Sequence, residues 1–294
     1  MPSTRDIRRR IKSVKNTAQI TKAMQMVASS KMRKAQLAAL AGRPYAALMN
    51  NILAHVSGRS GDFSHPLMEA REGGKRAVVV ISTDKGLCGA LNANLTREAA
   101  KFEKDTTVFV CAGKKGAQFV ARTRRQLAAE FTYKDAPLFA EARAISKFVQ
   151  EMFLNGEVNR VEILFTNFVS TLVQKPEART LLPIRELKDV QARVHGDEHQ
   201  ASAALEKSDV DYLFEPDAGG VLGSLLPHYL NFQVYQILLE AKASEHSSRM
   251  VAMKNATDNA KQLIKDLTLE YNKLRQANIT KELLEITTAQ MALG

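Results

Sequence analysis

The sequence predicts a mixed α/β fold in which long N- and C-terminal helices form an antiparallel coiled coil. A Rossmann-like α/β domain is inserted in the sequence between these two helices. Apolar residues recur every three or four positions at both ends of the 294-residue chain, as in a coiled-coil seam. Between them, short β-branched runs alternate with helical segments, which is typical of a mainly parallel sheet. We therefore assign the N-terminal coiled-coil helix to residues 1–57, the inserted domain to 75–200 and the C-terminal helix, its partner, to 211–294.

The first helix is predicted over residues 3–57. Ser3 or Thr4 can cap it, and Asp6 lies in the first turn, where a negative charge complements the helix dipole. Pro44 predicts a kink or break near Arg43. The expected seam consists of Ile7, Ile11, Val14, Ala18, Ile20, Met24 and Val27.

The middle of the chain has a different pattern. We expect buried strands at 77–82, 107–111 and 161–166, with a hairpin partner of the last at 168–175. Helices are expected at 90–103, 114–127 and 140–154. Residues 176–210 show little pattern and are expected to be a connection with a surface loop.

The C-terminal helix is predicted from about residue 216 to 293. No proline follows Pro227, and no glycine lies between Gly223 and Gly294. A helix of about 65–70 residues, with a rise of about 1.5 Å per residue, would be about 100 Å long. It would therefore extend beyond its N-terminal partner. Its expected seam is Met253, Ala256, Ala260, Leu263, Leu267, Tyr271 and Leu274. The unpaired apolar end must be covered by another protein.

The charge is concentrated at the N-terminus. The chain carries a net +11, and residues 1–34 hold ten basic residues and one acid. This segment predicts an acidic partner, which could be nucleic acid, anionic lipid or an acidic protein. The two cysteines, Cys88 and Cys111, fit no disulfide framework and are expected to be reduced. No apolar run is long enough to span a membrane, and no secretory signal or cleavable leader is recognised.

Two glycine-bearing turns follow predicted strands, where phosphate cradles occur. Thr83–Gly89 and Ala112–Gly116 lack the spacing of known nucleotide motifs, so we favour glycines required by the backbone. His195 and His199 could bind a metal, but we favour a solvated loop because no further ligand of suitable spacing is present. The basic residues at 114–125 indicate a solvated helix face or a docking surface for an acidic partner. No catalytic set, metal site or cofactor is predicted.

Five segments of the chain are distinctive: DIRRRIKSVKNTAQITKAMQMVASSKMRKAQ (6–36), STDKGLCGALN (82–92), YLFEPD (212–217), SSRMVAMKNATDNA (247–260) and YNKLRQANITKELLEI (271–286). They resemble the γ-subunit family of F-type ATP synthases, nearly end to end and in the same order. Residues 114–200 are the least distinctive part.

The resemblance implies a non-catalytic rotor. A γ subunit is the central stalk, whose coiled coil turns inside the α₃β₃ ring, where the β subunits carry the catalytic sites. Its partners are that ring, the ε subunit and the membrane c-ring. The implied location is the cytoplasmic side of a bacterial plasma (inner) membrane, as a peripheral subunit. A coupling role for ion transport and ATP synthesis follows, and no cofactor is expected.

The resemblance also implies roles for individual residues. Those at coupling contacts to α₃β₃ are Met24, Lys31, Arg33, Lys34, Arg249, Gln276 and Thr280. The tip that turns in an apolar bearing comprises Leu283, Leu284, Ile286, Met291 and Leu293. Tyr212 and Glu215 match the foot on the c-ring. The sequence departs from the family after its Glu-Ile pair, where small residues are usual and this chain has the bulkier Thr287, Thr288, Gln290 and Met291.

Two other functions remain as alternatives. A basic coiled-coil protein could bind nucleic acid through residues 5–34, with an affinity that falls steeply with salt. A nucleotide-binding enzyme could use the α/β domain, and would then bind or hydrolyse ATP alone.

Overall fold

The computed structural model describes residues 3–42, 44–45, 48–49, 52, 65–71, 73–184 and 218–293. Its contacts divide the chain into two compact units, Ser30–Ser248 and a second made of Met1–Ser29 with Arg249–Gly294. His195, His199, Tyr212 and Glu215 lie outside the described residues, so their predicted roles stay predictions.

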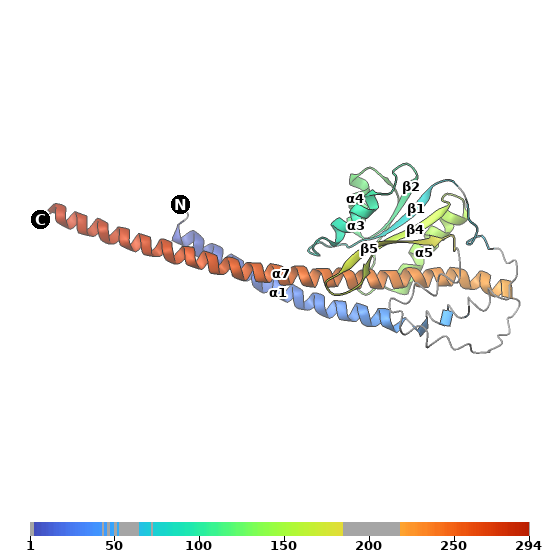
Figure 1. The fold of residues 1–294 in the computed structure, drawn as a ribbon, viewed down its shortest axis with the longest axis horizontal. Helices are drawn as coiled ribbons and strands as arrows, with labels where there is room; N and C mark the ends of the chain where they lie inside the picture. The colour runs from blue at the N-terminus through green and yellow to red at the C-terminus, as the bar shows by residue number, and fades with distance from the viewer. Residues whose placement is uncertain are drawn as a thin grey trace. The chain divides into compact units, whose positions relative to one another are not determined.

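The larger unit is built on a five-stranded sheet in the order β3-β2-β1-β4-β5 (Figure 1). The strands are β1 (Arg76–Ile81), β2 (Thr107–Ala112), β3 (Gln126–Phe131), β4 (Arg160–Phe168) and β5 (Gln174–Leu182). The first four run parallel, and β5 pairs antiparallel with β4. The predicted α/β class and mainly parallel sheet are confirmed.

Helices cover both faces of this sheet, which explains why β1 is apolar after Arg76 and β2 is apolar after Thr107. On one face, α3 (Leu91–Ala100) and α4 (Lys114–Arg122) bury Val78, Val80 and Phe109. On the other, α5 (Phe139–Leu154) and the first part of α7 (Ala218–Leu293) bury Val79 and Ile163. Figure 1 shows the two pairs of helices on opposite sides of the strands.

Two predictions for the middle of the chain are wrong in detail. Residues 114–127 are not one helix, because α4 ends at Arg122 and β3 begins at Gln126, after Arg124 with a positive φ of 52°. The hairpin partner of β4 is Gln174–Leu182 rather than 168–175. This strand was not predicted because it contains Pro176 and several charged residues. Both features are common in strands at the edge of a sheet.

The smaller unit contains the N-terminal part of α1 (Thr4–Ala41) and the C-terminal part of α7. The predicted cap of α1 is present: Ser3 Oγ accepts from the Asp6 backbone N–H, and the Asp6 carboxylate accepts from the Ser3 hydroxyl. The helix ends at Ala41, close to the predicted break before Pro44.

One pair of contacts fixes how the helices of the smaller unit align. The hydroxyls of Thr21 and Thr257 are 2.7 Å apart, and Arg8 donates to the Tyr271 hydroxyl, so residue numbers rise on α1 as they fall on α7. The pairing is antiparallel. It aligns two heptad series, 7, 11, 14, 18, 21, 25, 28 on α1 and 271, 267, 264, 260, 257, 253, 250 on α7, and every position in both is buried or half-buried.

This register corrects three predicted seam residues. Ile20 is 61% exposed, Val27 is 54% exposed and Leu263 is 39% exposed. Thr21, Ala28 and Ile264 occupy the seam instead. The error arose because several neighbouring positions are apolar, so hydrophobicity alone does not select the heptad.

Candidate functional site

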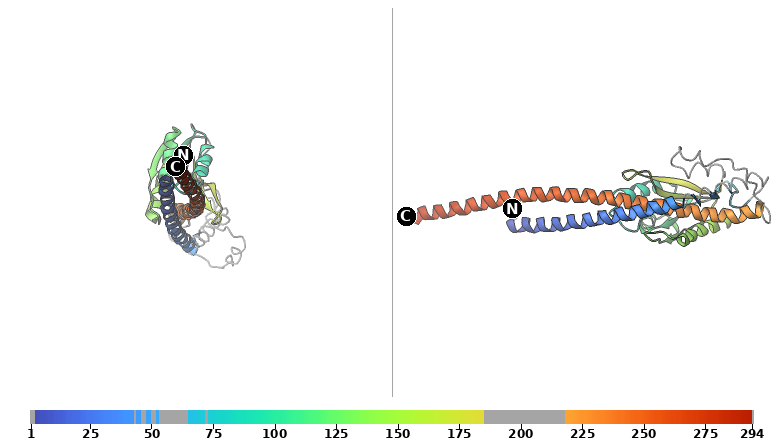
Figure 2. Two further views of the ribbon diagram at one scale, coloured as in Figure 1. Left: turned by 90° about the vertical axis from the view of Figure 1, so that its left-hand side faces the viewer. Right: turned by 90° about the horizontal axis from the view of Figure 1, so that it is seen from below.

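The C-terminal end of α7 extends beyond the pairing in the smaller unit. In the register set by Thr21 and Thr257, Thr4 at the start of α1 lies opposite Leu274. The helix nevertheless continues to Leu293 (Figure 2). We call residues 275–293 the overhang.

The overhang presents large apolar side chains to solvent. Its exposed apolar residues are Ile279, Leu283, Leu284, Ile286 and Met291, and Met291 is 84% exposed. Exposed apolar surface of this kind is a candidate site for binding a protein, a membrane or a ligand. The predicted tip residues 283, 284, 286 and 291 are therefore all accessible on this end of the helix.

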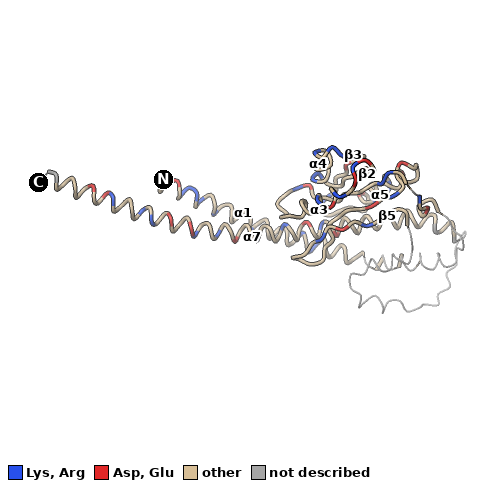
Figure 3. Tube along the Cα trace, turned by 45° about the horizontal axis from the view of Figure 1, so that its top comes forward, with Lys and Arg blue, Asp and Glu red and all other residues tan. Residues whose placement is uncertain are grey.

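A second apolar surface runs along the paired part of α1. Ile20, Met26 and Val27 are all more than half exposed, although they lie beside the buried seam. The helix therefore has two apolar faces, and α7 covers only one of them. Figure 3 shows basic residues clustered on the N-terminal turns of the same helix, whereas α7 carries both signs.

The predicted coupling residues of the smaller unit do not form one cluster. Met24 and Arg249 are both half-buried and lie near the seam. Gln276 and Thr280 are exposed on the overhang, where the Thr280 hydroxyl donates to the Gln276 carbonyl at 3.0 Å. They follow Arg249 by roughly 30 residues, about 40 to 45 Å along the helix axis.

The predicted basic contacts in the larger unit differ from one another. Arg33 and Lys34 are exposed, as a docking role requires. Lys31 is half-buried and donates to the Asp135 carboxylate at 2.5 Å, within the same unit. This hydrogen bond, opposed by partial burial and helped by the charges of Lys242 and Lys31, lowers the pKa of Asp135.

The two turns considered as phosphate cradles are occupied by the protein's own polar groups. The Asp84 carboxylate accepts from the Lys114 backbone N–H at 3.0 Å, which is where a phosphate would bind the N-terminus of α4. Ser82 Oγ accepts from the Gly116 N–H at 2.7 Å. Gly113 has a φ of 102°, and a Cβ there would lie 2.2 Å from the Ser82 carbonyl oxygen, so this glycine is required by the backbone.

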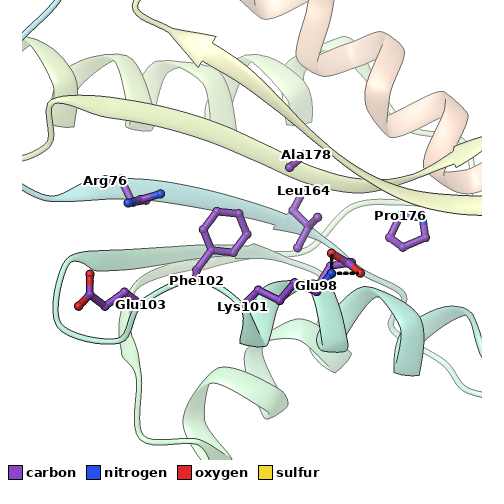
Figure 4. A pocket seen from close by; sticks show the side chains of 8 residues that line it. All are labelled: Arg76, Glu98, Lys101, Phe102, Glu103, Leu164, Pro176 and Ala178. Atoms are coloured by element: carbon purple, nitrogen blue, oxygen red, sulfur yellow. Dashed lines mark hydrogen bonds and ion pairs between the residues drawn. The ribbon is translucent and has the colours of Figure 1, made fainter.

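One shallow cavity of about 330 Å³ lies between the end of α3 and strands β4 and β5 (Figure 4). Glu98 and Lys101 form an ion pair at its rim, and Phe102 lies over the sheet. Among the described residues, no three His, Cys, Asp or Glu side chains are grouped so as to hold a metal ion. Cys88 and Cys111 are both buried thiols, and burial raises the pKa of the Cys111 thiol to about 12.

Comparison with known proteins decides the family. A family described as ATP synthase matches residues 3–293. The chain belongs to the ATP synthase gamma chain family. The gamma chain of Opitutus terrae is 52% identical over 99% of both chains, and that of Methylacidiphilum infernorum is 48% identical over the full length of both.

Solved structures share the fold of this gamma chain family member. A chain of the Euglena gracilis mitochondrial ATP synthase, in a structure of OSCP/F1/c-ring, aligns with a TM-score of 0.66 at 21% identity over 99% of this chain and 94% of its own. A chain of the Tetrahymena thermophila central stalk/c-ring aligns with a TM-score of 0.59 at 24% identity over 81% and 99%. In the described part of the chain, no helix is both long and apolar enough to cross a membrane.

The sequence did not draw attention to a run of buried polar residues on α7. These are Lys242, Ser244, Glu245, His246 and Ser247, each less than 5% exposed. The sequence pattern could have indicated this buried run. Lys242 and Glu245 are three residues apart on a helix, and the small residues around them permit close packing.

Proposed function

We propose that this chain is the rotating central shaft of an F-type ATP synthase, coupling ion flow through a membrane c-ring to catalysis on β subunits. The helix pair turns inside the α₃β₃ ring, and other parts of the chain meet the ε subunit and the c-ring. The chain itself carries no catalytic site. It is attached peripherally at the cytoplasmic side of a bacterial plasma membrane.

The observation that carries this proposal is the apolar overhang of α7. Five large apolar side chains are solvent-exposed there, on a helix that has no partner from α1 beyond Leu274. Apolar contact has no preferred direction, so a smooth sleeve can hold such a tip while it turns. Charged pairs buried at the same place would favour one angle strongly.

The predicted contact residues take their roles within this proposal. Leu283, Leu284, Ile286 and Met291 form the surface that turns in the sleeve. Met24, Arg249, Gln276 and Thr280 meet the ring at two levels of the shaft, since Met24 and Arg249 lie near the seam and the other two lie on the overhang. Arg33 and Lys34 offer positive charge to acidic loops, Lys31 does so only after leaving Asp135, and Tyr212 with Glu215 belong to the foot.

Reconstitution with α and β subunits tests the proposal. We expect the chain alone to hydrolyse no ATP and to form a complex with α and β that does. Failure to form that complex would refute the assignment, whereas hydrolysis by the chain alone would favour the enzyme alternative.

A variant of the overhang tests its role in the same assay. The double substitution Leu283→Ser and Ile286→Ser should change the free energy of unfolding by less than about 0.5 kcal/mol, because both side chains are exposed. Affinity for α₃β₃ should fall at least about tenfold, since each buried side chain is worth roughly 1.5–3 kcal/mol. Leu154→Ser on α5, 45% exposed, is the matched control and should bind normally. Normal binding by the double variant would exclude the overhang from the interface.

A further inference from the structure

The carboxyl ends of the parallel strands meet at one edge of the sheet in the larger unit. In α/β folds, ligands bind at this edge, in the crevice between neighbouring strands whose connections lead in opposite directions. Here that crevice lies between β1 and β4, because the strand order is β3-β2-β1-β4-β5. The loop 83–89 follows β1, and the turn 169–173 follows β4.

Two consecutive serines of α7 donate to these two segments. The Ser248 hydroxyl donates to the Cys88 carbonyl at 2.7 Å, and the Ser247 hydroxyl donates to the Thr171 carbonyl at 2.8 Å. Gln174, at the start of β5, adds a contact of 3.4 Å to Ser247 Oγ. One turn of α7 is thereby fixed to the loops on both sides of the crevice.

A buried lysine one to two turns earlier joins the same edge. Lys242 Nζ lies 2.9 Å from the Glu245 carboxylate, 3.7 Å from that of Asp135 and 4.4 Å from the centre of the Tyr133 ring. Tyr133 follows β3, and its hydroxyl donates to the Ser82 carbonyl at the end of β1. An amine that is 2% exposed needs such compensation, because burying an unpaired charge is costly.

The loop that receives Ser248 is itself held firmly. The Asn92 side chain on α3 donates to Thr83 Oγ1 at 2.8 Å, and Thr83 Oγ1 donates to the Lys85 carbonyl. Leu87 adopts a φ of 62°, a conformation that costs a non-glycine residue free energy and persists only when its surroundings impose it. The Cys88 carbonyl is thus presented in a fixed direction.

We propose that residues 242–248 of α7 occupy the ligand crevice of this α/β fold and hold the sheet to α7. Torque between the sheet and α7 then passes through the contacts of these residues. We call the contacts of Lys242, Ser247 and Ser248 the crevice clamp. This inference rests on the proposed rotary function. It gives loop 83–89 a mechanical role, and Ser247, Ser248 and Lys242 are positioning residues.

The test uses the variant Ser247→Ala with Ser248→Ala, both in the full chain and in the intact synthase in membrane vesicles. Losing a hydrogen bond worth about 1 kcal/mol should speed local opening about fivefold, so backbone amides of 83–89 and 169–173 should exchange hydrogen at least about fivefold faster. In vesicles, ATP hydrolysis should continue while ions pumped per ATP fall. Ser248→Thr, which keeps the hydroxyl at a half-buried position, should restore the coupling that Ser248→Ala loses.

Ser224→Ala is the control, since this exposed serine of α7 donates to the Val221 carbonyl within its own helix. Unchanged exchange in the double variant would overturn the clamp, and so would faster exchange with wild-type pumping per ATP. Should the double variant not fold, Ser248→Ala alone carries the same expectation. A wild-type chain that fails to join the synthase would instead refute the rotor assignment, so the two failures are distinguishable.

Discussion

Charged side chains at the carboxyl edge of the sheet form ion pairs with one another. Asp135 accepts from Lys31 and faces Lys242, and Lys242 in turn pairs with Glu245. These groups come from α1, from the segment before α5 and from α7. A single carboxylate therefore joins three parts of the larger unit that are far apart in sequence.

Asp135 gives the chain a predictable response to acid. The hydrogen bond from Lys31 is the largest cause that lowers the pKa of Asp135 below its ordinary value of 3.8. A carboxyl with a lowered pKa in the folded state stabilises the fold above the unfolded-state pKa, and this contribution is lost as the pH falls through the folded-state pKa. Asp135→Asn should therefore be less stable than wild type at pH 7, with the difference shrinking below about pH 4.

Urea unfolding of both proteins across pH 2.5–7 measures that difference. A gap independent of pH would show that the ionised carboxylate contributes nothing. Asp105→Asn, which replaces an exposed acid in the loop before β2, is the control and should track wild type at every pH.

At this scale the sequence predicted some contacts and missed others. The Ser3–Asp6 cap followed from local chemistry, because both partners lie within one turn. Lys31 was expected to face an acidic partner protein, and its partner in this chain, Asp135, is about a hundred residues away. Only tertiary structure brings such residues together, so no local pattern could reveal the pair.

Among the elements, the helix pair follows most directly from the sequence. The periodicity predicted two long helices and their antiparallel pairing, yet it chose Ile20 and Val27 for the seam where the structure has Thr21 and Ala28. A threonine pair in contact across the seam satisfies its own hydroxyls, which makes this less apolar register possible. The strand β3 was missed because most of its residues are exposed and none is β-branched.

Close approach of the two helices depends on small seam residues. Ala260 is 8% exposed and lies opposite Ala18 in the register set by Thr21 and Thr257. Ala260→Leu should destabilise the helix pair by about 1–3 kcal/mol, because added methyl groups overpack a seam that has no room for them. Thermal unfolding followed by circular dichroism measures the effect.

The neighbouring substitution Asn259→Leu is the matched control. Asn259 is exposed on the same turn, so the added leucine meets solvent and should change stability by less than about 0.5 kcal/mol. Equal effects of the two substitutions would mean that the register is wrong.

For the whole molecule, the central feature is that α1 and α7 each continue from one compact unit into the other. The boundaries at Ser29–Ser30 and Ser248–Arg249 fall inside unbroken helices. In the proposed rotor, torque passes along these two helices. The crevice clamp supplies the attachment of the sheet to α7 at the last residues before that boundary.

The sequence predicted this organisation more securely than it predicted the contact surfaces. The resemblance identified the family, and the periodicity predicted that the C-terminal helix is the longer one and has an uncovered apolar end. Exposure of Ile279 through Met291 then followed from a register that ends at Thr4. The surface that α1 presents beside the seam appeared only once Ile20 and Val27 were found outside it.

Direct observation of rotation tests the central claim. Lys104 is exposed in the loop before β2, and the native cysteines are buried, so Lys104→Cys gives one accessible site for a bead. With the α₃β₃ ring fixed to a surface, we expect ATP to drive stepwise turning of the bead in one direction. Complexes that hydrolyse ATP with the bead at rest would contradict the account.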